Sequence, residues 1–343
     1  MTVQTPAPSL TDFAARLLGW YGVQARDLPW RIPPGSDAVP DPYRVWLAEV
    51  MLQQTTVAAV AGYWQRFTAR WPTVADLAAA DDGEVMAAWA GLGYYARARN
   101  LLACARAVAA QYGGRFPDSE VALRALPGIG DYTAAAVAAI AFGRASVVVD
   151  ANIERVVARH SAISAPLPGA KAAIRAALAP HVPARRAGDF AQGLMDLGAG
   201  VCTVRRPRCD LCPVSSDCAG RGQGIAAALP VKAPKRAKPH RHGTAWWIAA
   251  DGALWLERRA DKGMLGGMRG LPGDDWRAAA PAGDAAASVT HSFTHFDLTL
   301  TIVRRAAPPP GADGEWWPLK DVDAAGLPTL YRKAVDAMRK EFR

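Results

Sequence analysis

The sequence predicts a mainly α-helical protein that ends in a second, smaller domain of α/β or α+β type. In residues 11–224, apolar side chains recur at helical spacing, and no segment alternates as a strand does. Farther along, two apolar runs flank Asp251-Gly252, which is the signal of a β-hairpin, and residues 288–305 alternate like one long strand. A final helix is expected over residues 331–342, so the second domain has about one hundred residues, a common domain size.

The helical region contains five segments with clear helical periodicity. They cover residues 11–22, 43–67, 84–92, 96–113 and 133–143. Cys104 lies in the fourth segment among apolar residues, where a small buried side chain is a better interpretation than a reactive thiol. The length of 343 residues suits two or three domains with sizeable cores.

The composition favours a polyanionic partner. The chain has a formal net charge of +9 at pH 7 and a pI near 9.5, although a merely basic, alanine-rich protein would look similar. Nucleic acid is favoured over a membrane, because the sequence has neither a basic amphipathic anchor nor a long apolar run. Residues 1–10 lack the features of a signal peptide, so we expect the chain in the cytoplasm, at the nucleoid if the cell is bacterial.

Residues 229–243 combine three prolines with five Lys or Arg residues and no acidic residue. This composition predicts a linker that is too charged and too Pro-rich to pack. It fits a plain spacer and a spacer that lies along a phosphate backbone equally well.

Four of the five cysteines lie within seventeen residues, in the spacing C-x6-C-x2-C-x5-C and with no histidine among them. They are Cys202, Cys209, Cys212 and Cys218. Zinc sites usually pair two C-x2-C knuckles or include histidine, whereas one knuckle with two wider arms favours an iron–sulfur cluster held by four thiolates. The loop between the first two cysteines displays three arginines, Arg205, Arg206 and Arg208, which either contact DNA phosphates or are incidental to a structural cluster.

The segment LPGIG at residues 126–130 predicts a tight hairpin between two helices. It lacks the GK[ST] ending of a P-loop, and the third glycine of GxGxxG would fall at Thr133. Gly128 and Gly130 let backbone amides point outward at the start of the next helix, where the helix dipole favours a phosphate. Leu126 and Ile129 complete this hairpin, which on its own could equally be a packing corner.

Two carboxylates have contrasting predicted surroundings. Glu49 has mainly apolar neighbours three and four residues away, so burial would raise its pKa and keep it protonated, although the polar edge of an amphipathic helix is the usual place for a glutamate. Asp150 follows three valines at a helix N-cap position, where backbone amides hold a carboxylate ionised, and capping alone would explain it. Together they match the acid and the anion of glycoside hydrolysis, which is the chemistry of removing a base from deoxyribose.

These segments together resemble the adenine DNA glycosylases of the MutY type, in the helix-hairpin-helix superfamily that includes endonuclease III. The resemblance rests on LPWR, EVMLQQT, GLGYYARARN, LPGIGDYTAAAV, VDANIERV, the cysteine spacing, KGMLGGMRGLPG and HSFTHF. It implies a two-lobed helical glycosylase domain with a [4Fe-4S] module, a basic linker and a Nudix-like domain that recognises 8-oxoguanine. The implied ranges are 1–225 for the glycosylase domain (helix-hairpin-helix lobe about 32–145, iron–sulfur lobe about 8–31 and 146–225), 226–242 for the linker and 243–343 for the last domain.

The resemblance also implies the reaction. A monofunctional glycosylase of this family would flip out adenine mispaired with 8-oxoguanine, or with guanine, in double-stranded DNA. Glu49 would protonate adenine N7 and then act as base for water, and Asp150 would stabilise the oxocarbenium ion. Tyr132 stands where bifunctional relatives carry the Schiff-base lysine, so strand cleavage by that route should be absent, and its phenol is expected to support both carboxylates. Asn152 matches the catalytic pocket, and Glu154 is a departure that also argues against lyase activity.

Further residues are assigned by the same resemblance. The adenine pocket would comprise Trp30, Arg31, Leu52 and Gln192, the DNA contacts would include Gln54, Thr55, Leu92 and Tyr94 besides the hairpin, and the 8-oxoguanine-reading loop would be Phe293, Thr294 and His295. A [4Fe-4S] cluster, a monovalent cation at the hairpin and a monomeric state are expected. The second domain lacks a glutamate-rich Nudix box, so pyrophosphohydrolase activity is not expected. The alternatives are an endonuclease III-like glycosylase and lyase for oxidised pyrimidines, and a non-catalytic iron–sulfur DNA-binding protein.

Overall fold

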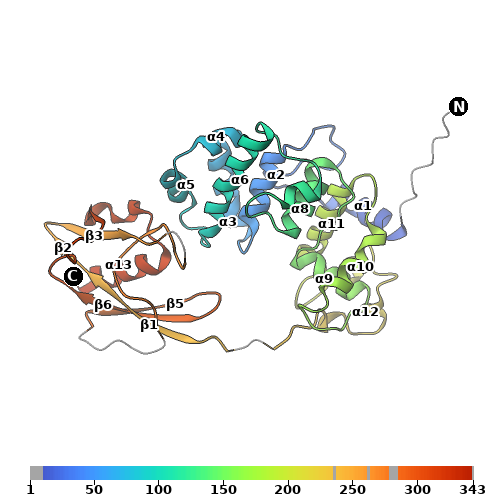
Figure 1. Cartoon of the computed structure of the whole chain (residues 1–343). Helices are drawn as coiled ribbons and strands as arrows, with labels where there is room; N and C mark the ends of the chain where they lie inside the picture. The colour runs from blue at the N-terminus through green and yellow to red at the C-terminus, as the bar shows by residue number, and fades with distance from the viewer. Residues whose placement is uncertain (1–10, 235–236, 261–262, 278–284, 342–343) are drawn as a thin grey trace. The chain divides into compact units, whose positions relative to one another are not determined.

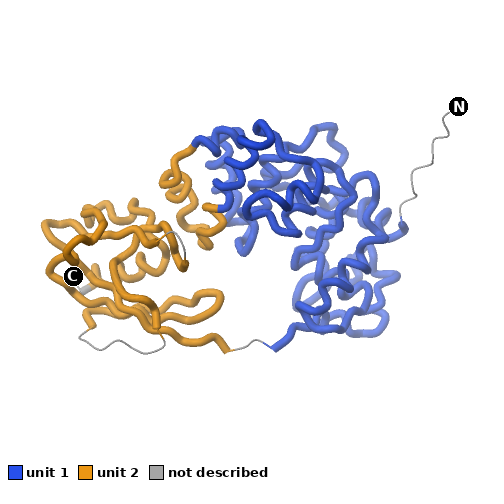
Figure 2. Tube along the Cα trace, in the orientation of Figure 1, with its two compact units in different colours: residues 1–79, 100–234 blue, residues 80–99, 235–343 orange. Residues whose placement is uncertain are grey.

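The computed structural model describes residues 11–234, 237–260, 263–277 and 285–341. The chain forms two compact units, which Figure 2 shows in two colours. Unit 1 comprises residues 1–79 and 100–234, and unit 2 comprises residues 80–99 and 235–343. The domain and lobe boundaries that the resemblance implies stay predictions.

Unit 1 is helical, and no strand precedes His240 in the described residues. Figure 1 shows its helices, which are α1 (Asp12–Gln24), α2 (Pro42–Leu52), α3 (Val57–Arg70), α4 (Val74–Ala79), α6 (Ala96–Tyr112, which begins in unit 2), α7 (Glu120–Arg124), α8 (Asp131–Phe142), α9 (Ala151–His160), α10 (Lys171–Leu178), α11 (Ala187–Gly200) and α12 (Ala219–Gly222). Short 3-10 turns occur at Ala179–His181, Cys209–Leu211 and Ala226–Ala228. Cys104 is buried in α6, as predicted.

The segment 43–67, predicted from one continuous periodicity, forms two helices. The α2 helix ends at Leu52, and Gln54 adopts the left-handed conformation with φ of 58°. The hydroxyl of Thr56 then caps α3 by accepting a hydrogen bond from the amide of Ala59 at 3.4 Å. This break places the residues after Glu49 in a loop at the edge of a cavity.

Helix α11 packs against α1, α8 and α9, and the four helices share one core. The α8 helix is buried along most of its length, and half of its twelve residues are alanine, which lets its neighbours approach closely. The α11 helix passes very close to the start of α9, since a Cβ placed on Gly198 would lie 2.6 Å from the Cβ of Asn152. A glycine at position 198 therefore allows α11 to support the residues that follow Asp150.

The first part of the predicted linker packs on unit 1. Leu229 is buried, its carbonyl accepts a hydrogen bond from Arg159 Nε at 2.9 Å, and the amide of Leu167 donates to the carbonyl of Val231 at 2.9 Å. A strand then begins at His240. The expectation that this whole stretch is too charged to pack is wrong, because Leu229 is buried and the backbone of Val231 and Ala233 pairs with Leu167. Residues 235–236 lie outside the described part.

Unit 2 contains two small sheets, with α13 (Thr329–Glu341) beside the strand β5 in Figure 1. Its strands are β1 (His240–Trp247), β2 (Ala249–Ala250), β3 (Ala253–Arg258), β4 (Arg269–Gly270), β5 (Ala287–Ser292), β6 (Asp297–Arg304) and β7 (Gly314–Pro318), and α5 (Asp82–Trp89) also belongs to this unit. The first sheet has the order β1-β6-β5, with β1 parallel to β6, and the second has the order β2-β3-β4, with β7 on β3. A 3-10 helix at Leu319–Ala325 precedes α13.

The sequence predictions for unit 2 are confirmed in two places and wrong in one. The hairpin at Asp251-Gly252 is present, with φ of 48° and 74° at its two turn residues, and the final helix is α13. The segment 288–305 is not one strand, because β5 and β6 pair antiparallel across a turn at residues 293–296. Among the described helices of the chain, none is long and apolar enough to cross a membrane.

Candidate active site

A cavity of about 740 Å³ in unit 1 brings together residues that are far apart in the sequence. The loop before α2, the end of α2, the start of α8, the start of α9 and the face of α11 contribute to its lining. Ten predicted residues line it, namely Trp30, Arg31, Glu49, Leu52, Gln54, Thr55, Tyr132, Asp150, Asn152 and Gln192. All the residues predicted for catalysis and for the adenine pocket therefore face one space.

Glu49 is the buried acid of this cavity. It is 5% exposed, and burial raises its pKa to about 7, helped by the charge of Asp150 and opposed by a hydrogen bond and by Arg31. The hydrogen bond comes from the hydroxyl of Tyr132, which donates to Glu49 Oε2 at 2.5 Å. The predicted burial and raised pKa of Glu49 are confirmed. Near neutral pH a substantial fraction of this carboxyl group holds its proton.

Asp150 caps α9, as predicted. Its Oδ1 accepts a hydrogen bond from the amide of Ile153 at 2.7 Å, and its Oδ2 accepts one from Asn152 Nδ2 at 3.0 Å. These bonds favour the anion, but burial outweighs them and raises the pKa of Asp150 above its usual value. Capping alone therefore does not describe the environment of Asp150, because the sequence does not show how far the start of α9 lies from solvent. Tyr132 donates to Glu49 and not to Asp150, so it supports only one of the two carboxylates directly.

Asn152 is held in turn by Arg155. Arg155 Nη2 donates to Asn152 Oδ1 at 2.9 Å and to the carbonyl of Gly198 at 2.6 Å, and Arg155 Nε donates to the carbonyl of Cys202 at 2.8 Å. The amide group of Asn152 consequently has its oxygen directed at Arg155 and its nitrogen at Asp150. A hydrogen-bonded chain links the cysteine segment to the capped carboxylate.

Sequence reasoning missed Asp196, a buried carboxylate of α11. Its Oδ1 accepts from Arg26 Nε at 2.7 Å, and its two oxygens accept from Arg31 Nη1 at 2.8 and 2.7 Å. The side chain of Asp196 is 1% exposed and that of Arg31 is 6% exposed. A carboxylate in the small and apolar second half of α11 was the available signal. Asp196 fixes Arg31, whose charge lowers the pKa of Glu49.

The hairpin has the predicted form, with α7 and α8 joined by residues 125–130. Gly128 has φ of 72°, and a Cβ there would lie 2.5 Å from the Cβ of Asn100, so this position requires glycine. Gly130 is the N-cap of α8 and supplies no side-chain cap, which leaves first-turn amides for an external acceptor. The side chains of Leu126 and Ile129 are buried, so only their backbone could reach a phosphate.

The four clustered cysteines line one small cavity of about 20 Å³, together with Arg159. Arg159 Nη1 lies 3.3 Å from Cys202 Sγ and donates to the carbonyl of Thr203 at 2.7 Å. In the described residues no group of three or more His, Cys, Asp or Glu side chains is placed to hold a single metal ion. The four cysteines thus lie around one space, and the iron–sulfur centre that their spacing favours stays a prediction.

The loop that follows the first of these cysteines exposes Arg205, Arg206 and Arg208, as predicted. Arg208 also donates through Nη2 to the carbonyl of Gly200, at the C-terminal end of α11. Arg205 and Arg206 are therefore the less restrained of the three cations.

The GLGYY segment, in unit 2, presents one of its two predicted wedge residues. Tyr94 is 52% exposed with φ of 50°, whereas Leu92 is 6% exposed and cannot act as a wedge in this conformation. The guanidinium of Arg97 lies 5.5 Å from the Tyr94 ring and 5.3 Å from the Trp89 ring, and its Nη2 donates to the carbonyl of Leu92 at 3.0 Å. Arg97 holds this turn in shape.

The predicted 8-oxoguanine-reading residues form the turn between β5 and β6. The amide of Phe293 donates to the carbonyl of Phe296 at 2.9 Å, and the Phe293 ring stacks on Trp276 with centroids 5.3 Å apart. Thr294 and His295 are exposed at the tip of the turn. Phe293 is thus held by its contacts within the domain, whereas Thr294 and His295 are exposed to solvent.

Two family models match the chain. The model for the HhH-GPD superfamily base excision DNA repair protein matches residues 47–180, and the model for the NUDIX domain matches residues 244–337. The first range contains Glu49, Tyr132 and Asp150. The predicted helix-hairpin-helix fold and the Nudix-like domain are confirmed, while the iron–sulfur lobe stays a prediction.

Curated proteins called adenine DNA glycosylase are similar to the chain. The protein of Rattus norvegicus is 46% identical over 229 residues, which cover 64% of this chain and 44% of that protein. The protein of Mus musculus is 34% identical over 416 residues, which cover 97% of this chain and 78% of that protein. The protein of Mycolicibacterium smegmatis is 43% identical over 222 residues, which cover 64% and 73%. The chain thus spans less than half of the rat relative and more than two thirds of the other two.

Two solved structures resemble the helical region. A thermostable thymine-DNA glycosylase is 32% identical with a TM-score of 0.54, covering 62% of this chain and 95% of that one. A non-covalent endonuclease III–DNA complex is 22% identical with a TM-score of 0.52, covering 63% and 99%. The second similarity concerns the fold alone.

Proposed function

Because this chain belongs to the adenine DNA glycosylase family, we propose that it hydrolyses the N-glycosidic bond of adenine mispaired with 8-oxoguanine, or with guanine, in double-stranded DNA. The observation that carries this proposal is the pairing of the buried Glu49 and the half-buried Asp150 on one cavity, supplied with different hydrogen bonds. The basic net charge of +9 supports a DNA partner.

The reaction begins with extrusion of the adenine from the stack, because the base cannot be attacked inside the duplex. Glu49 in its protonated form donates to adenine N7, so that the base departs neutral. The carboxylate of Asp150, whose charged form is favoured by hydrogen bonds from the Ile153 amide and from Asn152, stabilises the positive charge that develops on the sugar. Glu49, now ionised, takes the proton of the water that adds to the sugar.

Among the described residues that line the cavity there is no lysine, and Tyr132 lies where the resemblance places the Schiff-base lysine of bifunctional relatives. Its phenol donates to Glu49, and burial and the two carboxylates raise its pKa well above the usual value, so it stays a neutral donor. We therefore propose base removal without strand cleavage.

Cys202, Cys209, Cys212 and Cys218 would hold the [4Fe-4S] cluster, which when bound supplies a rigid cross-link of the chain at residues 202–218. The loop that carries Arg205 and Arg206 would thereby be fixed for contact with phosphates. A monovalent cation at the hairpin, a monomeric state and a cytoplasmic location are parts of the same proposal.

The test is a glycosylase assay on an A:8-oxoguanine duplex, with and without alkali. We expect adenine release, an abasic strand that remains intact until alkali is added, and loss of release in Asp150→Asn with duplex binding retained. No adenine release by protein that contains its cluster would refute the proposal. A borohydride-trapped adduct would instead support the lyase alternative, and binding without any base release would support the non-catalytic one.

A further inference from the structure

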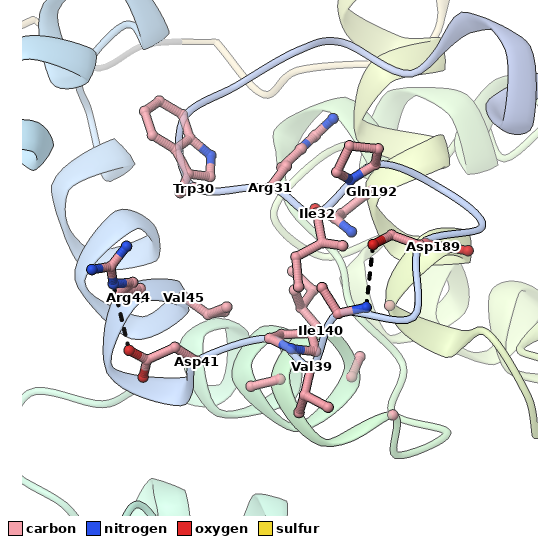
Figure 3. Close-up of a pocket in the computed structure, with 18 of the residues that line it drawn as sticks. Trp30, Arg31, Ile32, Val39, Asp41, Arg44, Val45, Ile140, Asp189 and Gln192 are labelled. Atoms are coloured by element: carbon pink, nitrogen blue, oxygen red, sulfur yellow. Dashed lines mark hydrogen bonds and ion pairs between the residues drawn. The ribbon is translucent and has the colours of Figure 1, made fainter.

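A second cavity of about 720 Å³ adjoins the catalytic cavity in unit 1. The two cavities share five lining residues, Trp30, Arg31, Val45, Ile140 and Gln192. These five side chains form the partition between the two cavities, which is therefore one side chain thick. Figure 3 shows Trp30, Arg31 and Gln192 along one side of this second cavity, and Val39, Asp41 and Arg44 along the opposite side.

The outer wall of the second cavity opens to solvent. Gly35, Ser36, Ala38 and Val39 of the loop before α2 contribute to it, and Val39 is 86% exposed. By contrast, Val45 and Gln192 on the partition are 5% and 7% exposed. The cavity therefore runs from the surface to the back of the catalytic pocket.

The charges of this cavity argue against an anionic ligand. Arg44 Nε is paired with Asp41 at 3.5 Å, Arg186 Nη2 with Asp189 at 2.8 Å, and Arg31 with Asp196 at 2.7 Å. Because each guanidinium already has a carboxylate, a phosphate would gain little there. A neutral molecule is the better match.

The remaining lining groups suit a planar, polar heterocycle. The indole rings of Trp30 and Trp64 lie 6.2 Å apart at 62°, and they offer aromatic faces to a flat molecule. The Gln192 side chain is 7% exposed and lines both cavities, so its amide is available to a molecule that passes between them. An amide can donate and accept at once, as the edge of a purine base requires.

The front of the catalytic cavity is closed during the reaction by DNA. A flipped nucleotide stays attached to its strand, so the sugar and phosphates cover the entrance through which the base came. After cleavage the free base would be confined between the abasic sugar and the back wall. It needs either dissociation of the DNA or a second way out.

We propose that the second cavity is the exit chamber for the free purine, which crosses the partition at Trp30 and Gln192 and reaches solvent while the abasic strand remains bound. This inference rests on the proposed function. No covalent step is involved, because the glycosidic bond is already broken and the departing species is neutral adenine.

The first experiment uses the unsubstituted protein with its cluster, bound to a duplex that contains an abasic site opposite 8-oxoguanine. Labelled adenine is added, and its binding is measured by equilibrium filtration. We expect adenine to bind this preformed complex with an affinity within about threefold of that for the DNA-free protein. Absence of binding to the complex, together with binding to the DNA-free protein, would overturn the exit route.

The second experiment narrows the outer cavity without touching the catalytic pocket. Ala38→Trp/Val39→Trp adds two indoles at positions that line only the second cavity, and Val23→Trp is the matched control, an exposed valine of α1 that lines neither cavity. In a single turnover on DNA with labelled adenine, the alkali-revealed cleavage rate should be unchanged in both variants. Appearance of adenine in the filtrate should slow about tenfold or more in the double variant and stay unchanged in Val23→Trp.

The outcomes separate the two proposals. Absence of cleavage by the unsubstituted protein would refute the proposed function. Two results with normal cleavage would refute only the exit chamber. One is that the unsubstituted protein releases adenine and the abasic strand together. The other is that Ala38→Trp/Val39→Trp releases adenine at an unchanged rate.

Discussion

The end of α2 and the start of α9 each bring one carboxylate to the same cavity, the buried Glu49 and the half-buried Asp150, but they supply it with different partners. Glu49 accepts one hydrogen bond from a phenol, and its pKa rises to about 7. Asp150 accepts bonds from a backbone amide and from Asn152, which oppose the effect of burial on its pKa. Burial alone would make both groups acids. The extra hydrogen-bond donor at Asp150 favours its charged form, which suits Asp150 to the role of anion and Glu49 to the role of proton donor.

The largest expected effect comes from removing the proton donor. Glu49→Gln keeps the shape and the hydrogen bond from Tyr132 but cannot give up a proton, so single-turnover adenine release should fall about 10³-fold. The measurement is rapid-quench cleavage with and without alkali. Duplex affinity should change less than about threefold, and an active Glu49→Gln enzyme would show that another group protonates the base.

Asp196→Asn tests whether Asp196 holds Arg31 in place near Glu49. Removing the charge of Asp196 leaves two guanidinium groups without their buried carboxylate, which should lower the free energy of unfolding by about 3 kcal/mol. The matched control is Asp189→Asn on the same helix, whose carboxylate is more exposed and pairs with Arg186 alone, and it should cost less than about 1 kcal/mol. Urea unfolding of the cluster-containing protein measures both, and equal losses would contradict the role given to Asp196.

Asn152→Ala weakens the donors around Asp150. Loss of one hydrogen bond to a carboxylate corresponds to about 1.5–3 kcal/mol, so adenine release should slow roughly 10- to 100-fold. The pKa of Asp150 should rise further, which moves the acidic limb of the pH–rate profile to higher pH. Glu154→Ala, two residues along α9, serves as the control and should leave that limb in place. An unmoved limb in Asn152→Ala would show that Asn152 does not tune Asp150.

The smallest expected effect concerns stability at alkaline pH. The pKa of Glu49 is about 7 in the folded protein and 4.5 as a free side chain, so folding is favoured by the protonated form, and this stability is lost as pH rises from about 4.5 through 7. Glu49→Gln should therefore be more stable than the unsubstituted protein by about 2 kcal/mol at pH 8.5 and nearly equal to it at pH 5. Urea unfolding at the two pH values gives the difference. A variant less stable at pH 8.5 would contradict the burial of an ionisable acid.

Local features of the site could be predicted from the sequence, and long-range ones could not. The burial of Glu49 follows from its neighbours on one helix, the capping by Asp150 follows from its place before α9, and the cysteine group follows from spacing alone. The pairing of Asp196 with Arg26 and Arg31 joins residues 165 or more positions apart, and no local pattern encodes it. The raised pKa of Asp150 likewise depends on how α9 enters the core.

Two wrong predictions of the fold, one helix over residues 43–67 and one strand over residues 288–305, have a common cause. The break between α2 and α3 falls in Gln53–Thr56, and the turn between β5 and β6 falls in Phe293–Phe296, and neither stretch contains glycine or proline. Tertiary pairing sets these turns without the usual turn residues, so an uninterrupted pattern hid them. The hairpins at Gly128 and Gly252, where glycine adopts positive φ, were predictable for the opposite reason.

The pH–rate profile of adenine release in a single turnover tests the central claim most directly. With protonated Glu49 as the acid, the rate should fall about tenfold per pH unit above roughly pH 7, and the residual activity of Glu49→Gln should lack this limb. A rate that stays constant or rises between pH 7 and 9 in the unsubstituted protein would contradict the assignment of Glu49 as the proton donor.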